Sequence, residues 1–227
     1  MRGIIFDLDD TLYPRERFIH SGMAAVSRHV EQAWGIPADA AFATLFHATT
    51  RGRRGMEFQE LCQRHSLPTE ALPGLVQVFR SHLPNLWPSH GAVAMLQALR
   101  AEGWRIAILT NGLPHVQAAK IRALGLRALV DHIVYAEEYA EGGKPARGPF
   151  LEVLRRLGIP ADQCVCVGDD PRNDIQGARA LGIRTIRVAR PGVKPAADAE
   201  ADAVVHMVAD VPARAAALVE MVTAHVA

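Results

Sequence analysis

The sequence has few cysteines, no long apolar run and no excess of charge of either sign. Three cysteines in 227 residues do not form the disulfide framework of a small secreted domain. No apolar stretch approaches the roughly 20 residues that a bilayer-spanning helix needs, and Asp7 and Asp9 interrupt the first apolar run, where a signal peptide is uncharged. A formal net charge of +1 gives no bias toward nucleic acid or an anionic membrane. We therefore expect a cytoplasmic protein with no nucleic-acid or membrane partner.

Two of the cysteines, Cys164 and Cys166, lie two positions apart in a predicted strand and therefore face the same way. Their spacing differs from the usual two-residue gap of a zinc ligand pair, and no second Cys/His pair stands nearby. We interpret them as buried, reduced thiols that act as small core residues.

Three apolar segments run directly into acidic, hydroxyl or amide residues. The segments are 3–6, 106–109 and 164–167, and they lead into Asp7-Leu8-Asp9-Asp10-Thr11, Thr110-Asn111-Gly112 and Gly168-Asp169-Asp170. A continuous apolar run is typical of a parallel strand buried on both faces. Because open α/β sheets bind ligands at the carboxyl ends of their strands, up to five carboxylates are expected to meet there. Such a gathering requires a cation and points to metal-dependent chemistry on an anionic group, with phosphate as the leading candidate.

The order of predicted elements divides the chain into two parts. Residues 15–86 contain apolar residues at helical spacing, turns rich in Gly and Pro, and no convincing strand, which predicts an inserted unit of roughly four helices. Residues 1–14 and 87–227 alternate strands with helices, including a helix predicted over 175–181. Repeated βα units predict an α/β fold with a doubly wound parallel sheet.

The cluster around Asp7 and Asp9 is the strongest signal for catalysis. Two carboxylates two positions apart at a strand end project toward the same side. One is able to attack phosphorus as a nucleophile, and the other to protonate the leaving oxygen and later take a proton from water. Taken alone, the cluster is equally well explained as an acidic loop that caps the next helix.

The other polar segments carry complementary groups. The Thr110 hydroxyl and the main-chain N–H groups of Asn111 and Gly112 suit phosphoryl oxygens, although Thr-Asn-Gly is also an ordinary turn. Lys144 offers the positive charge that a phosphoryl group beside carboxylates needs, although most lysines are merely solvated. Segment 168–174 places carboxylates, including Asp169 and Asp174, at a strand end, and such hard oxygen ligands suit Mg²⁺. Alternatively, the segment is a helix N-cap, with Asp174 in the first turn.

Taken together and in order, these segments resemble the four motifs of the haloacid dehalogenase-like hydrolase superfamily. The motifs are Asp7-x-Asp9-x-Thr11, Thr110, Lys144-Pro145 and Gly168-Asp169-x4-Asp174, and they span the whole chain. The resemblance implies a Rossmann-like core with a mobile helical cap of subclass I, here residues 15–86. Many relatives carry a second proline where this chain has Arg147, but the spacing from the lysine to Phe150 is kept.

The resemblance also implies a role for each motif residue. Asp7 corresponds to the nucleophile and Asp9 to the general acid and base. Thr110 and Lys144 correspond to the residues that hold the phosphoryl group. The implied Mg²⁺ ligands are Asp7, the main-chain carbonyl of Asp9 and Asp169, with Asp174 binding or orienting a ligand water. Because it has a carboxyl group at Asp9, the chain resembles the phosphatases of the family, whereas the dehalogenases proper lack a carboxyl group at this position.

The sequence thus predicts a Mg²⁺-dependent phosphatase that hydrolyses a small phosphorylated metabolite through an aspartyl-phosphate. A short likeness to pyrimidine 5′-nucleotidases in 10–14 and 49–52 keeps a nucleotide substrate open, and a phosphomutase is disfavoured because Asp10 stands where such relatives often have Gly. Outside the enzymes, a phospho-receiver domain would be shorter and lack the helical insert, and a scaffold need not keep every reactive residue. Three arginines, Arg51, Arg53 and Arg54, lie among the glycines of 51–55. They contact either an anionic or planar leaving group or, in the preferred interpretation, only solvent.

Overall fold

The computed structural model describes residues 1–52, 55–140, 142–189 and 201–225. They form two compact units, which we call the core unit and the helical unit. The core unit combines Met1–Pro14 with Trp87–Ala227, and the helical unit is Arg15–Leu86. Each unit is considered separately below.

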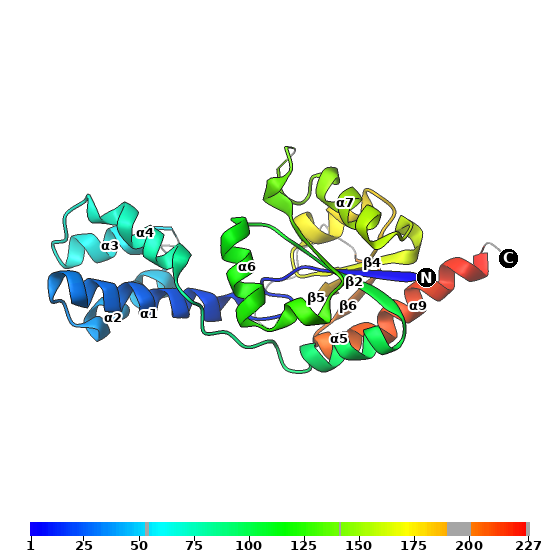
Figure 1. Cartoon of the computed structure of the whole chain (residues 1–227), viewed down its shortest axis with the longest axis horizontal. Helices are drawn as coiled ribbons and strands as arrows, with labels where there is room; N and C mark the ends of the chain where they lie inside the picture. The colour runs from blue at the N-terminus through cyan, green and yellow to red at the C-terminus, as the bar shows by residue number, and fades with distance from the viewer. Residues whose placement is uncertain (53–54, 141, 190–200, 226–227) are drawn as a thin grey trace. The chain divides into compact units, whose positions relative to one another are not determined.

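The core unit is built on a parallel sheet whose strand order is β3-β2-β1-β4-β5-β6 (Figure 1). The strands are β1 (Arg2–Phe6), β2 (Trp104–Thr110), β3 (His132–Tyr135), β4 (Cys164–Gly168), β5 (Arg184–Val188) and β6 (Ala203–Val205). In the ladder, Ile4 lies between Ile106 of β2 and Val165 of β4. The predicted doubly wound parallel sheet is therefore confirmed, and β1 lies at its centre.

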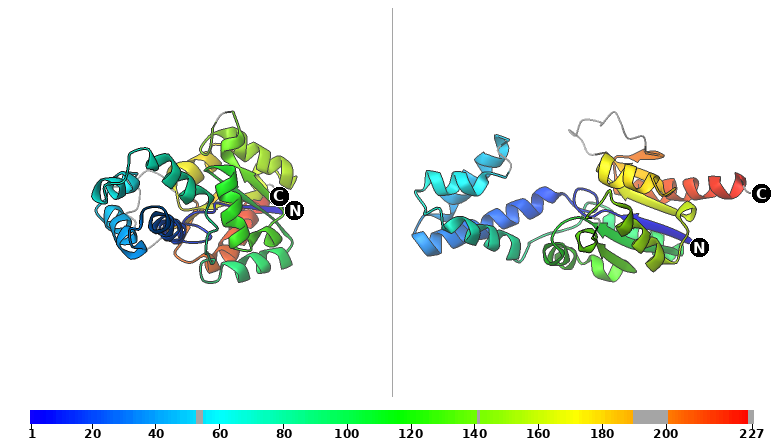
Figure 2. Two further views of the ribbon diagram at one scale, coloured as in Figure 1. Left: turned by 60° about the vertical axis from the view of Figure 1, so that its left-hand side comes forward. Right: turned by 90° about the horizontal axis from the view of Figure 1, so that it is seen from above.

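Helices pack on both faces of this sheet (Figures 1 and 2). Helix α7 (Arg147–Leu157) contacts β2 and β3, whereas α9 (Val211–His225) contacts β4 and β5, and α5 (Ala92–Ala101) contacts β2. Ile5, Ala107 and Cys166 share one core cluster with Phe150 of α7. Alternate residues of the same strands, such as Ile4 and Ile106, are fully buried as well. Burial on both faces explains why these strands read as unbroken apolar runs.

The three cysteines confirm the interpretation of their pattern. Cys62, Cys164 and Cys166 are free thiols and all are buried. Cys164 and Cys166 belong to the same core cluster, so both side chains face the same side of the sheet. Burial raises the pKa of Cys164 to about 12 and raises the pKa of Cys166 well above the ordinary value for a thiol.

The helix predicted over 175–181 begins earlier than the sequence suggests. A π-helical turn, η4 (Pro171–Gln176), precedes the short helix α8 (Gly177–Arg179). The side chain of Asp170 accepts hydrogen bonds from the main-chain N–H groups of Arg172 and Asn173, both at 2.9 Å. Pro171 at the first position fits a helix start, because its missing N–H would have no partner there. The predicted start at 175 was therefore wrong by four residues.

The helical unit consists of four helices in the described part of 15–86. They are α1 (Arg15–Trp34), α2 (Ala38–Thr50), α3 (Glu57–Arg64) and α4 (Ala71–Ser81). All four contribute to one buried apolar cluster, through residues such as Val26, Leu45, Leu61 and Leu75. The unit therefore has a hydrophobic core of its own.

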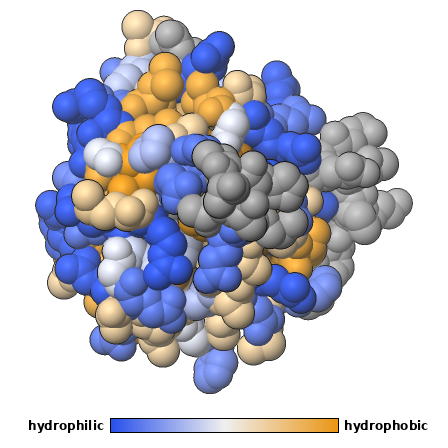
Figure 3. Space-filling view, turned by 90° about the vertical axis from the view of Figure 1, so that its right-hand side faces the viewer, coloured by the Kyte–Doolittle hydropathy of each residue, from blue (hydrophilic) through white to orange (hydrophobic). Residues whose placement is uncertain are grey.

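Figure 3 views the side on which β1 begins, where hydrophilic residues predominate around a smaller apolar area. Among the helices of the described residues, none combines the length and the apolar character that a membrane span requires.

Candidate active site

Three polar segments meet at one edge of the core sheet. Strands β2, β1 and β4 are neighbours and run in the same direction, so their carboxyl ends lie together. Thr110 ends β2, while Asp7 and Asp169 directly follow β1 and β4. The Asp7 N–H donates to the carbonyl of Val167 at 2.9 Å, which continues the ladder one residue beyond β1. Segments far apart in the sequence thus come together because of the strand order.

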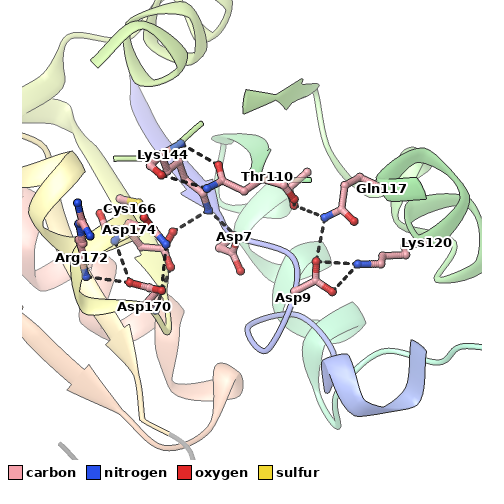
Figure 4. A network of polar contacts seen from close by, with 12 residues as sticks. Asp7, Asp9, Thr110, Gln117, Lys120, Lys144, Cys166, Asp170, Arg172 and Asp174 are labelled. Atoms are coloured by element: carbon pink, nitrogen blue, oxygen red, sulfur yellow. Dashed lines mark hydrogen bonds and ion pairs between the residues drawn. The ribbon is translucent and has the colours of Figure 1, made fainter. Parts of the chain in front are cut away.

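Three carboxylates form a compact cluster at this edge. One oxygen atom from each of Asp7, Asp169 and Asp174 lies within 4.8 Å of the others. Asp7 and Asp174 are buried, and Asp169 is half-buried. Asp174 reaches the cluster from η4 (Figure 4), and it accepts a hydrogen bond from the Asp170 N–H at 3.0 Å. The acidic cluster therefore has three members among the described residues, because Asp170 caps η4 and Asp9 bonds elsewhere.

Gly168 is required for this approach. A β-carbon at position 168 would lie 2.2 Å from Oδ2 of Asp174, closer than non-bonded atoms come in proteins. The strand must therefore end in glycine if the Asp174 carboxylate is to lie against it.

Lys144 connects two of the three carboxylates. Its ammonium donates to Oδ1 of Asp7 at 2.6 Å and to Oδ1 of Asp174 at 2.7 Å, in a buried setting (Figure 4). Asn111 fixes the Lys144 backbone, because its amide donates to the Lys144 carbonyl at 3.0 Å and accepts from the Lys144 N–H at 2.8 Å. The Asn111 side chain thus positions the lysine, which leaves only its main-chain N–H to serve a phosphoryl group.

Burial shapes the proton affinities of this pair. Loss of hydration raises the pKa of Asp7; Lys144 lowers it and Asp174 raises it again, and the balance is upward. Burial lowers the pKa of Lys144, but the carboxylates of Asp174 and Asp7 outweigh this and raise it. Lys144 is therefore charged throughout the physiological range.

Asp9 has hydrogen-bond partners that differ from those of Asp7 and Asp174 (Figure 4). Lys120 donates to both of its carboxylate oxygens, at 2.8 and 2.9 Å, and Gln117 donates to Oδ2 at 2.8 Å. The Tyr13 hydroxyl donates to Oδ1 at 2.5 Å. Burial raises the pKa of Asp9. The charge of Lys120 and the hydrogen bonds lower this pKa by more than burial raises it, so the net shift is downward. Asp9 is therefore held as the anion.

Sequence reasoning missed Gln117 and Lys120. Both lie on α6 (Pro114–Ala123), and Gln117 also donates to Oγ1 of Thr110 at 2.6 Å. The available signal was their spacing, since residues three apart share a helix face and this helix begins just after the Thr110 turn. The partner of that face, however, is set by tertiary packing.

The carboxylate cluster fits a divalent cation. Three carboxylates and the single ammonium of Lys144 leave two negative charges when all are ionised. Hard oxygen ligands at this separation match the preference of Mg²⁺, which takes few protein carboxylates and keeps several waters.

Comparisons with known proteins agree with this geometry. A model of haloacid dehalogenase-like hydrolases matches residues 1–182. The chain is 29% identical to a glyceraldehyde 3-phosphate phosphatase of Methanocaldococcus jannaschii, over 88% of this chain and 90% of that protein. It is 31% identical to a ribulose-1,5-bisphosphate 5-phosphatase of Halopiger xanaduensis, over 81% of this chain and 83% of that protein.

A solved structure supports the fold. The magnesium-bound hydrolase YfnB of Bacillus subtilis has a TM-score of 0.70 and 21% identity, covering 94% of this chain and 98% of that one. The chain belongs to the haloacid dehalogenase-like hydrolase family. The family and the phosphatase relatives together identify the chain as a phosphoric monoester hydrolase. The receiver-domain and scaffold alternatives receive no support from these relatives.

Proposed function

We propose that the protein is a Mg²⁺-dependent phosphatase of a small phosphorylated metabolite and that Asp7 forms an aspartyl-phosphate. The observation that carries the proposal is the cluster of Asp7, Asp169 and Asp174 within 4.8 Å, beside the buried ammonium of Lys144. This arrangement supports a nucleophilic role for Asp7, with the three carboxylates as cation ligands and Lys144 as a positive charge beside them.

In the first half-reaction, a carboxylate oxygen of Asp7 bonds to phosphorus while the bond between phosphorus and the ester oxygen breaks. In its protonated form, Asp9 gives a proton to the departing oxygen, which leaves as an alcohol. In the second, Asp9 takes a proton from water, the water oxygen bonds to phosphorus, and the carboxylate of Asp7 departs. The ionised Asp9 of this structure is the form that the second half-reaction uses.

Asp7, the main-chain carbonyl of Asp9 and Asp169 would hold Mg²⁺, with Asp174 binding it or orienting a ligand water. When bound, Mg²⁺ supplies positive charge that polarises the phosphoryl group and offsets the charge of the attacking carboxylate. Lys144 adds a fixed positive charge on the same side, and Asn111 keeps its backbone in place.

Substrate choice is proposed to belong to the helical unit, which would act as a cap that excludes water. Arg51 is exposed just after α2, while Arg53 and Arg54 lie outside the described residues. The named activities of the relatives make short sugar phosphates the first substrates to test.

The decisive experiment measures release of inorganic phosphate from a panel of phosphorylated metabolites with Mg²⁺, including glyceraldehyde 3-phosphate, ribulose 1,5-bisphosphate and pyrimidine 5′-nucleotides. The wild type should hydrolyse at least one of them, and Asp7→Asn should hydrolyse none while keeping its circular dichroism spectrum. Turnover by Asp7→Asn at the wild-type rate would exclude the covalent route.

A further inference from the structure

Helix α6 carries two buried polar side chains that the proposed mechanism has not used. Gln117 is 2% exposed and Lys120 is 5% exposed. Burying an amide or an ammonium group is costly unless it is hydrogen-bonded, so the partners of these groups are informative. Both bond to Asp9, and Gln117 also bonds to Thr110 (Figure 4).

The orientation of the Gln117 amide follows from its partners. Its Nε2 lies 2.8 Å from Oδ2 of Asp9 and 2.6 Å from Oγ1 of Thr110. The ionised Asp9 carboxylate has only acceptor oxygens, so the nitrogen of the Gln117 amide, and not its oxygen, must face it. One amide hydrogen serves Asp9 and the other serves Thr110.

This bond fixes the role of the Thr110 hydroxyl. Because Oγ1 accepts from Gln117, its own proton remains to be donated to another group. Within the part of the chain that the structure describes, that proton is directed to the Asn111 carbonyl at 3.4 Å, which is long for an O–H donor. Phosphoryl oxygens accept hydrogen bonds, so the hydroxyl has the orientation that a bound phosphoryl group needs.

The turn after β2 holds Gln117 in place. Gly112 has a φ of +112°, and a β-carbon there would lie 3.3 Å from Cδ of Gln117. The amide therefore packs against the same Thr-Asn-Gly turn whose hydroxyl it orients. Lys120 contacts both oxygens of Asp9 and limits rotation of that carboxylate.

We propose that Gln117 is a positioning residue that orients the Thr110 hydroxyl as a donor to the phosphoryl group and, with Lys120, fixes the Asp9 carboxylate beside it. The proposal rests on the phosphatase function proposed above. It assigns Gln117 no contact with the substrate.

The test compares Gln117→Met and Gln117→Glu with the wild type, using p-nitrophenyl phosphate and Mg²⁺. Methionine keeps the side-chain volume but donates no hydrogen bond, and glutamate keeps the shape but offers acceptors. Both should lose roughly 10-fold to 100-fold in kcat/KM, as expected for hydrogen bonds to charged or reacting groups. The inhibition constant of inorganic phosphate should rise in both. The control Gln97→Leu removes an exposed glutamine of α5 and should behave as the wild type.

A double-mutant cycle separates positioning from a structural role. Combining Gln117→Met with Thr110→Val should cost less than the product of the two single losses by at least ~3-fold, because the two residues act through one bond. Strictly multiplicative losses, or an unchanged kcat/KM in a folded Gln117→Met protein, would overturn the proposal. A folded wild type that hydrolyses no phosphate ester would instead remove the proposed function, and the positioning role with it.

Discussion

Two buried lysines divide the acidic residues of the site. Lys144 pairs with Asp7 and Asp174, whereas Lys120 pairs with Asp9. Asp7 and Asp9 are only two residues apart, yet their carboxylates bond to different lysines. The roles proposed for Asp7 as nucleophile and Asp9 as proton-transfer group require different partners, because each side chain must keep its own orientation and its own proton affinity.

Asp9→Asn tests the proton-transfer role at the level of one residue. The amide cannot carry the proton, so kcat should fall at least ~100-fold, the low end of what general acid–base catalysis contributes. Steady-state kinetics on an aryl phosphate gives the loss, and circular dichroism checks the fold. A wild-type rate in a folded variant would remove Asp9 from this role.

The buried thiols make a second residue-scale prediction. The thiolate is the reactive form, and burial raises the pKa of both Cys164 and Cys166, to about 12 for Cys164. At pH 8 the native protein should therefore react slowly with a thiol reagent, and all three cysteines should react once it is denatured. Rapid labelling of Cys164 or Cys166 in the native state would contradict their burial.

At the scale of elements, the short connection from β4 into η4 does much of the positioning. Asp169, Asp170 and Asp174 lie within six residues, but Asp170 differs from the other two in what it does in the structure. Asp169 and Asp174 join the carboxylate cluster, while Asp170 caps the π-helical turn that presents Asp174.

Gly168→Ala should disturb this arrangement. The added methyl group would displace the Asp174 carboxylate, so activity should fall at least ~10-fold and more Mg²⁺ should be needed for half-maximal rate. Gly74→Ala is the matched control, because a β-carbon there meets nothing within 4 Å. Position 74 lies inside α4, where alanine is favoured over glycine, so activity should persist and the melting temperature should rise slightly. Equal behaviour of the two variants would refute the packing argument.

The sequence predicted the elements better than the contacts between them. Unbroken apolar runs were enough to predict β1, β2 and β4, and the residues that follow them were enough to predict Asp7, Thr110 and Asp169 at one edge. The contacts of Gln117 and Lys120 were not predicted. Their spacing shows that the two residues share a helix face, but it does not show what that face packs against. A helix cap within 168–174 was an open alternative, but it was not assigned to Asp170 because adjacent aspartates are indistinguishable until the backbone path is known.

At the scale of the whole molecule, the residues proposed to carry out the reaction all belong to the core unit. The motif residues Asp7, Asp9, Thr110, Lys144, Asp169 and Asp174 fall within Met1–Pro14 and Trp87–Ala227. The helical unit has its own apolar cluster. This division fits the proposal that the core unit carries out the phosphate chemistry and that the helical unit selects the substrate.

Cation binding should also stabilise the whole protein. A ligand that binds only the folded state raises the melting temperature in proportion to the logarithm of its concentration, once it is in excess of Kd. Mg²⁺ should therefore raise the melting temperature of the wild type, and Asp169→Asn should show a smaller rise. Calorimetry with and without Mg²⁺ measures both, and identical shifts would place the bound cation elsewhere.

The most direct test of the account is hydrolysis of p-nitrophenyl phosphate before and after exhaustive removal of divalent cations by a chelator. We predict that the rate falls at least ~100-fold and returns when Mg²⁺ is restored, because the cation supplies several kcal/mol of transition-state stabilisation. A rate that stays undiminished after chelation would contradict Mg²⁺-dependent hydrolysis at this carboxylate cluster.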